Sequence, residues 1–214
     1  LRQRLTQAIA SAGTRLQNDP ALMAMVDNGA ESAVRYVAER FDGEIVNCDS
    51  TAVFRGFDIG TDKTAPADRR GIPHHLIDIA EPIEEYTAAR FARDAAAAIR
   101  DIQARGKLPL LVGGTGFYFR ALTRGLFPGP GRDDRLRGRL ESIAARRGVG
   151  FVHRLLARVD PESGRRIQPR DLKRLVRALE VFFLTGRPLT AHFADTVSPI
   201  PDIEILAIAL RLPA

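Results

Sequence analysis

Two short apolar segments of the chain are each followed by residues that could take part in phosphate binding or proton transfer. Residues 108–112 precede the sequence Gly-Gly-Thr-Gly at 113–116, and residues 44–48 precede Asp-Ser-Thr at 49–51. A short aliphatic run bounded by glycine is typical of a buried parallel strand. A glycine-rich turn after such a strand lets backbone N–H groups approach a ligand, commonly phosphate. We therefore expect a carboxylate and a phosphate-sized loop to face each other across a crevice at one edge of an open α/β sheet.

The sequence leaves a second interpretation open for each of these groups. The glycine turn could be a plain tight turn at the end of a strand. Asp49 could act as a general base, or it could cap the turn that follows it. The hydroxyl of Thr115 could donate to a diphosphate oxygen, or it could satisfy a backbone group in the turn.

Hydrophobic periodicity and breaker residues predict the elements that position these groups. Helices are expected over residues 21–40, 84–105, 117–123, 132–147, 150–158 and 171–185, and further short strands over 75–79 and 203–210. For the helix over 171–185, Asp171 is the expected N-cap and Gly186 follows the C-terminus. Its periodicity leaves Lys173, Arg174 and Arg177 outside the expected buried stripe. That stripe consists of Leu172, Leu175, Val176, Leu179, Phe182 and Phe183.

The composition favours a compact intracellular protein. A chain of 214 residues with 45% hydrophobic residues suits one domain, or one domain with an appendage. We expect a cytoplasmic protein without a membrane partner, because no run approaches ~18 apolar residues and no basic-then-apolar signal segment opens the chain. The single cysteine, Cys48, fits a reducing compartment. With four histidines it forms no recognisable zinc pattern, so we expect no metal-ligating cluster.

The positive charge of the chain is concentrated in one segment. The net charge is +6, and residues 131–187 contain 15 Lys or Arg against 7 Asp or Glu. The rest of the chain contains 17 against 19, so the basic excess lies wholly within that segment. Such a distribution is expected of a protein that binds a polyanion such as RNA, although a solvated arginine-rich surface gives the same count.

Five segments resemble, in their order and spacing, the tRNA dimethylallyltransferase family, whose members prenylate an adenine in the anticodon loop of tRNA. They are DSTAVFRGFDIGTDK at 49–63, PHHLID at 73–78, YTAARF at 86–91, LVGGTGFY at 111–118 and RLVRALEV at 174–181. The resemblance covers about residues 38–214. It implies an α/β fold with a P-loop NTPase-like parallel sheet flanked by helices, and with a basic helical insertion or subdomain. It also implies transfer of a dimethylallyl group from dimethylallyl diphosphate to the N6 amino group of an adenine next to the anticodon.

The same resemblance implies roles for individual residues. Asp49 corresponds to the general base that acts on the adenine amino group. Ser50, Thr51 and Ala52 correspond to the stretch that contacts the flipped-out base. Thr115, expected to be catalytic together with Asp49, corresponds to a tRNA contact near the reacting centre. Together with Gly113 and Gly114 we also expect it to bind diphosphate. Further tRNA contacts are implied for Arg137, Lys173, Arg174, Leu175, Val176 and Arg177.

The implied partners are a tRNA anticodon stem-loop and dimethylallyl diphosphate, with Mg²⁺ as the implied cofactor, and we expect a monomer. The chain departs from the family at its start. The family's P-loop is expected at residues 24–31, where only Gly29 matches and where Ala30 and Glu31 replace the lysine and the Ser/Thr. That lysine would neutralise phosphate charge and that hydroxyl would hold Mg²⁺. The family also continues into further helices after the last strand, so we expect little or no catalytic activity from this chain.

These observations predict three parts. Residues 1–40 form an atypical and foreign helical segment, because residues 16–22 resemble the soluble helical part of a bacterial membrane-protein family. Residues 41–130 and 200–214 form the α/β core with the prenyl-transfer crevice, and residues 131–199 form a helical tRNA-binding region. Two other functions are kept as alternatives. One is a non-catalytic RNA-binding protein that acts through its basic segment, and the other is a small-molecule kinase of the P-loop class.

Overall fold

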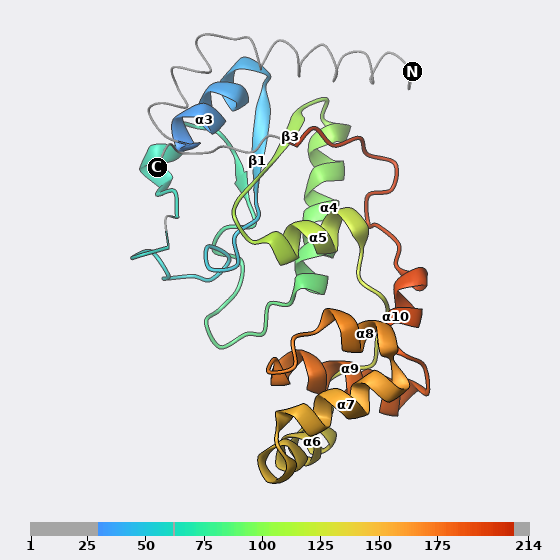
Figure 1. The fold of residues 1–214 in the computed structure, drawn as a ribbon. Coiled ribbons are helices and arrows are strands. Elements are labelled where there is room, and N and C mark those ends of the chain that lie inside the picture. Colours follow the sequence, from blue (N-terminus) through green and yellow to red (C-terminus); the bar gives the residue numbers. More distant parts are fainter. Residues whose placement is uncertain (1–29, 62, 208–214) are drawn as a thin grey trace. The chain divides into compact units, whose positions relative to one another are not determined.

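The computed structural model describes residues 30–61 and 63–207 (Figure 1). Residues 124–197 form one compact unit, and the described residues before and after them form the other. Three sequence expectations lie outside the described residues. They are the P-loop position at 24–29, the resemblance at 16–22 and the first part of the helix expected over 21–40. The domain boundaries expected from the sequence stay predictions.

The first unit is built on a parallel sheet of β1 (Gly43–Asn47), β2 (His74–His75) and β3 (Leu108–Val112), in the order β2-β1-β3. The α/β fold and the strand over 108–112 are confirmed, and β1 begins one residue before its expected start. The register pairs Asn47 with Val112, so β1 and β3 end level with each other. The residues that follow these two strands therefore begin side by side.

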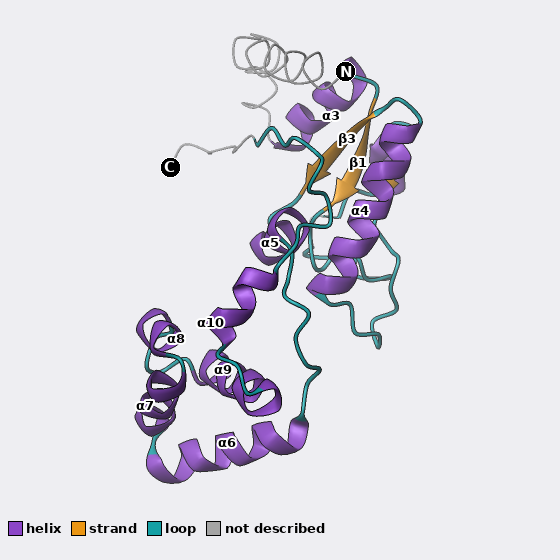
Figure 2. Ribbon diagram, turned by 90° about the vertical axis from the view of Figure 1, so that its right-hand side faces the viewer, coloured by secondary structure: helices purple, strands orange, loops and turns teal. Residues whose placement is uncertain are grey.

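Three helices accompany this sheet: α3 (Ala30–Arg40), α4 (Ala88–Ala104) and α5 (Gly116–Arg124). Figures 1 and 2 show α3 and α4 on opposite sides of β1 and β3. The inward stripe of α4 includes Phe91, which is fully buried and stacks on Tyr118 of α5 with ring centroids 4.3 Å apart. This contact joins α4 to α5, whereas Ala33 of α3 belongs to a separate apolar cluster with Tyr36, Val37 and Phe41.

The start of α4 corrects the expected helix over 84–105. The Thr87 side chain accepts a hydrogen bond from the backbone N–H of Arg90 at 3.1 Å, which makes Thr87 the N-cap. Residues 84–87 therefore precede the helix, because an N-cap residue has an extended backbone and satisfies the first free N–H groups of the helix.

Two expected strands are also corrected. The strand expected over 75–79 is limited to His74–His75, because Leu76 and Asp78 have φ angles of 62° and 56°, in the left-handed region that a strand does not use. Residues 203–207 are not a strand, and 208–210 lie outside the described residues. Ile205 and Leu206 are 44% and 45% exposed, and alternating apolar residues form a strand only where a neighbouring backbone pairs with them.

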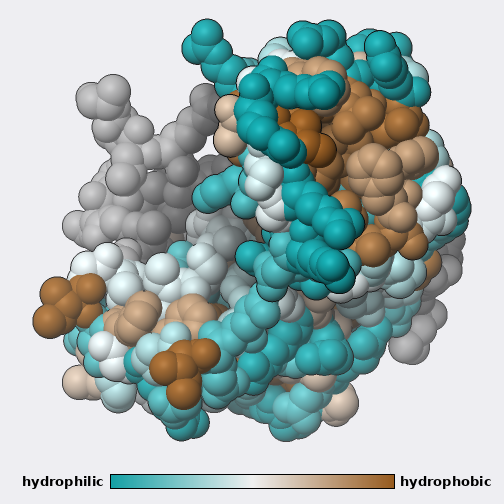
Figure 3. Space-filling view, turned by 90° about the horizontal axis from the view of Figure 1, so that it is seen from below, coloured by the Kyte–Doolittle hydropathy of each residue, from teal (hydrophilic) through white to brown (hydrophobic). Residues whose placement is uncertain are grey.

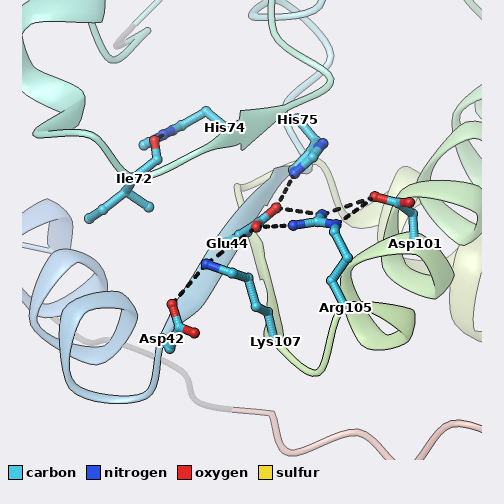
Figure 4. Close-up of polar contacts among 8 residues, drawn as sticks. All are labelled: Asp42, Glu44, Ile72, His74, His75, Asp101, Arg105 and Lys107. Atoms are coloured by element: carbon cyan, nitrogen blue, oxygen red, sulfur yellow. Dashed lines mark hydrogen bonds and ion pairs between the residues drawn. The ribbon is translucent and has the colours of Figure 1, made fainter.

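A buried carboxylate fastens the amino-terminal end of β1 (Figure 4). Glu44 is 1% exposed and accepts hydrogen bonds from both terminal nitrogens of Arg105, while His75 Nε2 lies 2.7 Å from Glu44 Oε2. The Arg105 hydrogen bonds are the main cause that lowers the pKa of Glu44 to about 2, against the opposing effect of burial. This cluster joins β1 to β2 and to the residue that follows α4, at the end of the sheet away from the loops after β1 and β3.

The second unit is helical. Its elements are α6 (Asp134–Arg147), α7 (Val149–Val159), α8 (Pro161–Arg166), α9 (Leu172–Thr185) and α10 (Leu189–His192), followed by a short 3-10 turn over Phe193–Asp195. The predicted caps of α9 are confirmed, since Asp171 accepts from the backbone N–H of Arg174 and Gly186 is left-handed. The core of this unit consists of Leu140, Ala144, Val152, Leu156, Leu175, Val176, Ala178 and Leu179.

The buried stripe expected for α9 is partly wrong. Phe183 is 50% exposed, Phe182 is half-buried, and the charged Glu180 is fully buried in their place. Other large apolar side chains also remain at the surface, among them Ile59 and Ile83, at 97% and 96% exposed. On the face seen from below, Figure 3 shows a broad group of hydrophobic side chains at the upper right and isolated ones at the lower left.

Candidate active site

The loops after β1 and β3 are hydrogen-bonded to each other, as the parallel sheet predicts. The backbone N–H of Cys48 donates to Val112 at 2.7 Å, and that of Thr115 donates to Cys48 at 3.1 Å. The Thr115 hydroxyl oxygen accepts from the Ser50 N–H at 3.0 Å and lies 3.3 Å from the Ser50 hydroxyl. The structure therefore brings together the residues predicted around Asp49 with those of the glycine turn.

Gly113 explains why this turn is rich in glycine. Its φ is +151°, and a Cβ at this position would lie 2.4 Å from the carbonyl carbon of Cys48 and 2.9 Å from the N of Asp49. No real side chain tolerates such contacts, so the close approach of the two backbones requires glycine here. A Cβ at Gly114 would meet nothing within 4 Å, which leaves open space above that part of the turn.

Asp49 caps the turn that follows it, so that interpretation is confirmed. Its Oδ1 accepts from the Thr51 N–H at 2.8 Å, the Thr51 hydroxyl at 2.5 Å and the Ala52 N–H at 3.3 Å. Burial raises the pKa of Asp49, but these hydrogen bonds outweigh burial and hold the pKa below its ordinary value. The carboxylate is therefore ionised at neutral pH.

Asn47 is a site residue that the sequence reasoning missed. It is 7% exposed, and its Oδ1 accepts from the Asp49 N–H at 3.1 Å. Its Nδ2 donates to the carbonyls of Asp49 at 3.1 Å and Leu76 at 2.9 Å. A single carboxamide therefore holds both backbone groups of Asp49 and the segment after β2. The available signal was an amide residue at the carboxyl end of the strand, two residues before Asp49.

Lys63 is a second residue without a predicted role. Its side chain is only 4% exposed, and its Nζ donates to Phe54 O at 2.8 Å, Asp58 Oδ1 at 2.8 Å and Asp78 Oδ1 at 2.7 Å. Burial lowers the pKa of Lys63, but the two carboxylates outweigh burial and raise the pKa. Lys63 therefore fastens the long loop after Asp49 to the segment after β2.

The residues predicted to contact tRNA in the helical unit differ in their surroundings. Leu175 and Val176 are buried in the core, so their side chains offer no contact to tRNA, because the apolar stripe of α9 needs both. Lys173 and Arg174 are exposed, as expected, and Arg174 pairs with Asp171 at 3.3 Å. Ala52, in the first unit, is likewise buried, which leaves only its backbone for contact with a base.

Arg137 and Arg177 share a buried partner that sequence reasoning missed. Glu180 Oε1 accepts from Arg137 Nε at 2.8 Å and Oε2 from Arg137 Nη2 at 2.8 Å, while Arg177 Nη1 donates to Oε2 at 2.6 Å. Arg177 lies outside the buried stripe as expected, but it is half-buried rather than exposed, because this pairing and a bond to Pro130 O hold its guanidinium. Burial raises the pKa of Glu180, but the two arginines lower it overall to about 2.

The described ranges 30–61 and 63–207 contain no group of three or more His, Cys, Asp or Glu side chains able to hold a metal ion. No helix in that part of the chain is both long and apolar enough to cross a bilayer.

The fold and these loops define an α/β protein of the P-loop NTPase-like class. The model of the IPP transferase family matches residues 52–214, and the chain belongs to that family. Thr115, Arg137 and the α9 residues lie within the matched segment, and Asp49 lies three residues before it.

Named relatives agree with this assignment. A tRNA dimethylallyltransferase of Solibacter usitatus is 54% identical over 167 residues, covering 78% of this chain and 54% of the relative. One of Halorhodospira halophila is 57% identical over 154 residues, covering 72% and 50%. The chain thus spans about half the length of the curated relatives it matches. A solved eukaryotic dimethylallyltransferase, described as acting on tRNA, superimposes with a TM-score of 0.66 at 30% identity, covering 79% of this chain and 43% of that one.

Proposed function

We propose that this chain carries the adenine-binding and diphosphate-binding loops of a tRNA dimethylallyltransferase. The reaction transfers a dimethylallyl group from dimethylallyl diphosphate to the N6 amino group of an adenine next to the anticodon of tRNA. The observation that carries the proposal is the hydrogen-bonded pair of loops, in a member of the IPP transferase family. These loops put an ionised Asp49 beside the glycine turn that would receive the diphosphate.

Asp49 is proposed as the general base. As the allylic carbon forms its bond to N6, the bond from that carbon to the diphosphate oxygen breaks, and the diphosphate leaves with the electron pair. The amino group becomes strongly acidic only as this new bond forms, so a weakly basic carboxylate suffices to take its proton. The low pKa of Asp49 agrees with this role, because the group must be ionised before the adenine arrives.

The glycine turn is proposed to hold the diphosphate. Gly113, Gly114 and Thr115 lead directly into the N-terminus of α5 at Gly116, where free backbone N–H groups and the helix dipole favour an anion. The open space above Gly114 leaves room for phosphate oxygens at this point. To donate to the leaving group or to the tRNA, the Thr115 hydroxyl would give up its contact with the Ser50 hydroxyl. It could still accept from the Ser50 N–H.

Mg²⁺ is proposed to enter with the diphosphate. Mg²⁺ is commonly held by one or two carboxylates together with substrate phosphates and water. The described residues offer no cluster of three ligands, so phosphate oxygens and water would provide the coordination. When bound, the ion would neutralise charge on the leaving group. Because the proposed substrate is tRNA, we also propose a cytoplasmic protein, and a monomer.

An RNA-binding protein without transferase activity is the second candidate, favoured by the arginine-rich helical unit. Asp49→Asn separates the two, because asparagine keeps an oxygen for the turn hydrogen bonds but cannot take a proton. The chain is incubated with dimethylallyl diphosphate, Mg²⁺ and an anticodon stem-loop, and transfer is followed by RNA mass. Calorimetry measures diphosphate and RNA binding separately.

We expect both ligands to bind, and slow transfer that Asp49→Asn abolishes while RNA binding is retained. We expect transfer to be slow because Ala30 stands in the position of the P-loop lysine that would neutralise phosphate charge. RNA binding without diphosphate binding or transfer would support the second candidate. Transfer that survives Asp49→Asn, or a chain that binds neither ligand, would overturn the proposal.

A further inference from the structure

The outer face of α6 carries arginines at a helical spacing that no predicted role uses. Arg135, Arg139 and Arg146 lie at positions i, i+4 and i+11, which fall on one face of a helix, and all three are exposed. Gly138 and Ser142 lie among them and leave a shallow hollow, which Asp134 and Ile143 complete. We call Arg135, Arg139 and Arg146 the α6 arginine stripe.

The charges of this stripe are not balanced by carboxylates among the described residues. Over residues 30–61 and 63–207, no carboxylate oxygen lies within 4.0 Å of these three guanidinium groups; Arg146 Nε donates only to the Ser142 carbonyl, at 3.3 Å. Asp134, at the edge of the hollow, already pairs with Arg132 at 2.5 Å. Six arginines of the unit have acidic partners, and others such as Arg158 and Arg165 have none among the described residues. The paired ones are Arg132, Arg137, Arg166, Arg174, Arg177 and Arg187. The stripe therefore concentrates unpaired positive charge.

We propose that the α6 arginine stripe binds the phosphate backbone of RNA, as a contact surface additional to Arg137 and the residues of α9. The inference rests on the proposed function for the identity of the RNA. Eleven residues of helix span about 16 Å, which is long enough to follow several phosphates. Guanidinium groups bind phosphates through two N–H groups at once, and the absence of side chains at Gly138 lets a backbone approach the helix.

The alternative of an anionic membrane surface is less favoured by the same helix. A helix that lies on a membrane inserts an apolar face between the lipids. The apolar face of α6 is already used, because Leu140 and Ala144 are buried in the core of the unit and Leu136 packs against it. The exposed face is polar, so its chemistry suits a hydrated, repeating anion.

The test is a salt titration of RNA binding by the full chain. The variant Arg135→Gln/Arg139→Gln/Arg146→Gln is compared with wild type, using fluorescence anisotropy of an anticodon stem-loop at several KCl concentrations. A phosphate contact contributes about 0.7–0.9 to the slope of log affinity against log salt. We therefore expect the slope to fall by about 2–3 and the affinity to fall about tenfold or more near physiological salt.

A matched control replaces three equally exposed arginines that already have acidic partners: Arg132→Gln/Arg166→Gln/Arg187→Gln. It removes the same net charge from the same unit. Because these arginines are already paired with carboxylates, we expect it to change the slope by well under half as much. Equal slopes for wild type and the stripe variant, or equal losses in both triple variants, would overturn the inference. Circular dichroism confirms that both variants are folded.

A second probe, polyuridylate of the same length, separates this inference from the proposed function. If wild type binds both RNAs alike and only the stripe variant loses the salt slope, the stripe is supported and recognition of the anticodon stem-loop is not. If the stem-loop is preferred and the stripe variant binds it like wild type, the proposed function stands and the inference fails. If neither RNA binds, both fail.

Discussion

Replacing Glu180 tests the energetic role of the most buried charge in the helical unit. Glu180 is fully buried and accepts from the Asp133 N–H as well as from Arg137 and Arg177. The fall of its pKa from 4.5 to about 2 corresponds to about 3 kcal/mol in favour of the folded state. Breaking a buried pair by removing one partner costs about 3–5 kcal/mol. Because both arginines are partly exposed, we expect Glu180→Gln to lose about 3 kcal/mol at neutral pH.

Urea denaturation followed by far-UV circular dichroism measures this loss, and a pH series gives its cause. The folded pKa of Glu180 is below the unfolded one, so its contribution is present above about pH 4.5 and is lost as the pH falls toward 2. Glu180→Gln should therefore be less stable than wild type at pH 7 and approach it near pH 2. Glu141→Gln, an exposed position on α6, is the control and should change stability by less than about 0.5 kcal/mol. Equal stability of Glu180→Gln and wild type at pH 7 would refute the reasoning.

Further predictions concern the first unit. Gly113→Ala should lower the free energy of unfolding by about 2–4 kcal/mol in urea denaturation, because the new Cβ meets the backbone of Cys48. Gly114→Ala, which has open space, should lower it by less than about 1 kcal/mol. Similar losses in the two variants would contradict the close-approach argument. Thr87→Ala should cost about 1 kcal/mol through loss of the α4 N-cap, and thermal melts showing no change would count against it. Glu44→Gln should weaken the loss of stability between about pH 4.5 and 2, since the folded pKa is depressed; an unaltered acid profile in the same denaturation series would be inconsistent with the Arg105 pairing.

The sequence was sufficient to predict the parts of the fold that depend on local patterns. Aliphatic runs bounded by glycine indicated strands over 44–48 and 108–112, and the parallel arrangement then required that the loops carrying Asp49 and Thr115 meet, as the bond from Ser50 N–H to Thr115 shows. Asp171 and Gly186 marked the ends of α9 because capping depends on residues within one turn. These features need no knowledge of distant contacts.

The features that the sequence could not predict depend on contacts between distant residues. Glu180 is buried because Arg137, 43 residues earlier, folds back onto it, and helical periodicity alone favoured Phe183 as the buried residue. The carboxamide of Asn47 acts through Leu76, 29 residues away. Residues 203–207 of the strand expected over 203–210 are not a strand, for the related reason that apolar residues do not themselves supply a pairing partner.

The contact between Gly113 and Cys48 has a mechanical consequence. The two backbones touch with no side chain between them, and the bonds of Cys48 N–H and Thr115 N–H close the contact on both sides. The glycine turn therefore cannot shift without moving Asp49. We expect the proposed diphosphate and adenine sites to be coupled through this contact. A ligand that fixes the turn also fixes Asp49, and the coupling free energy has the same size in both directions.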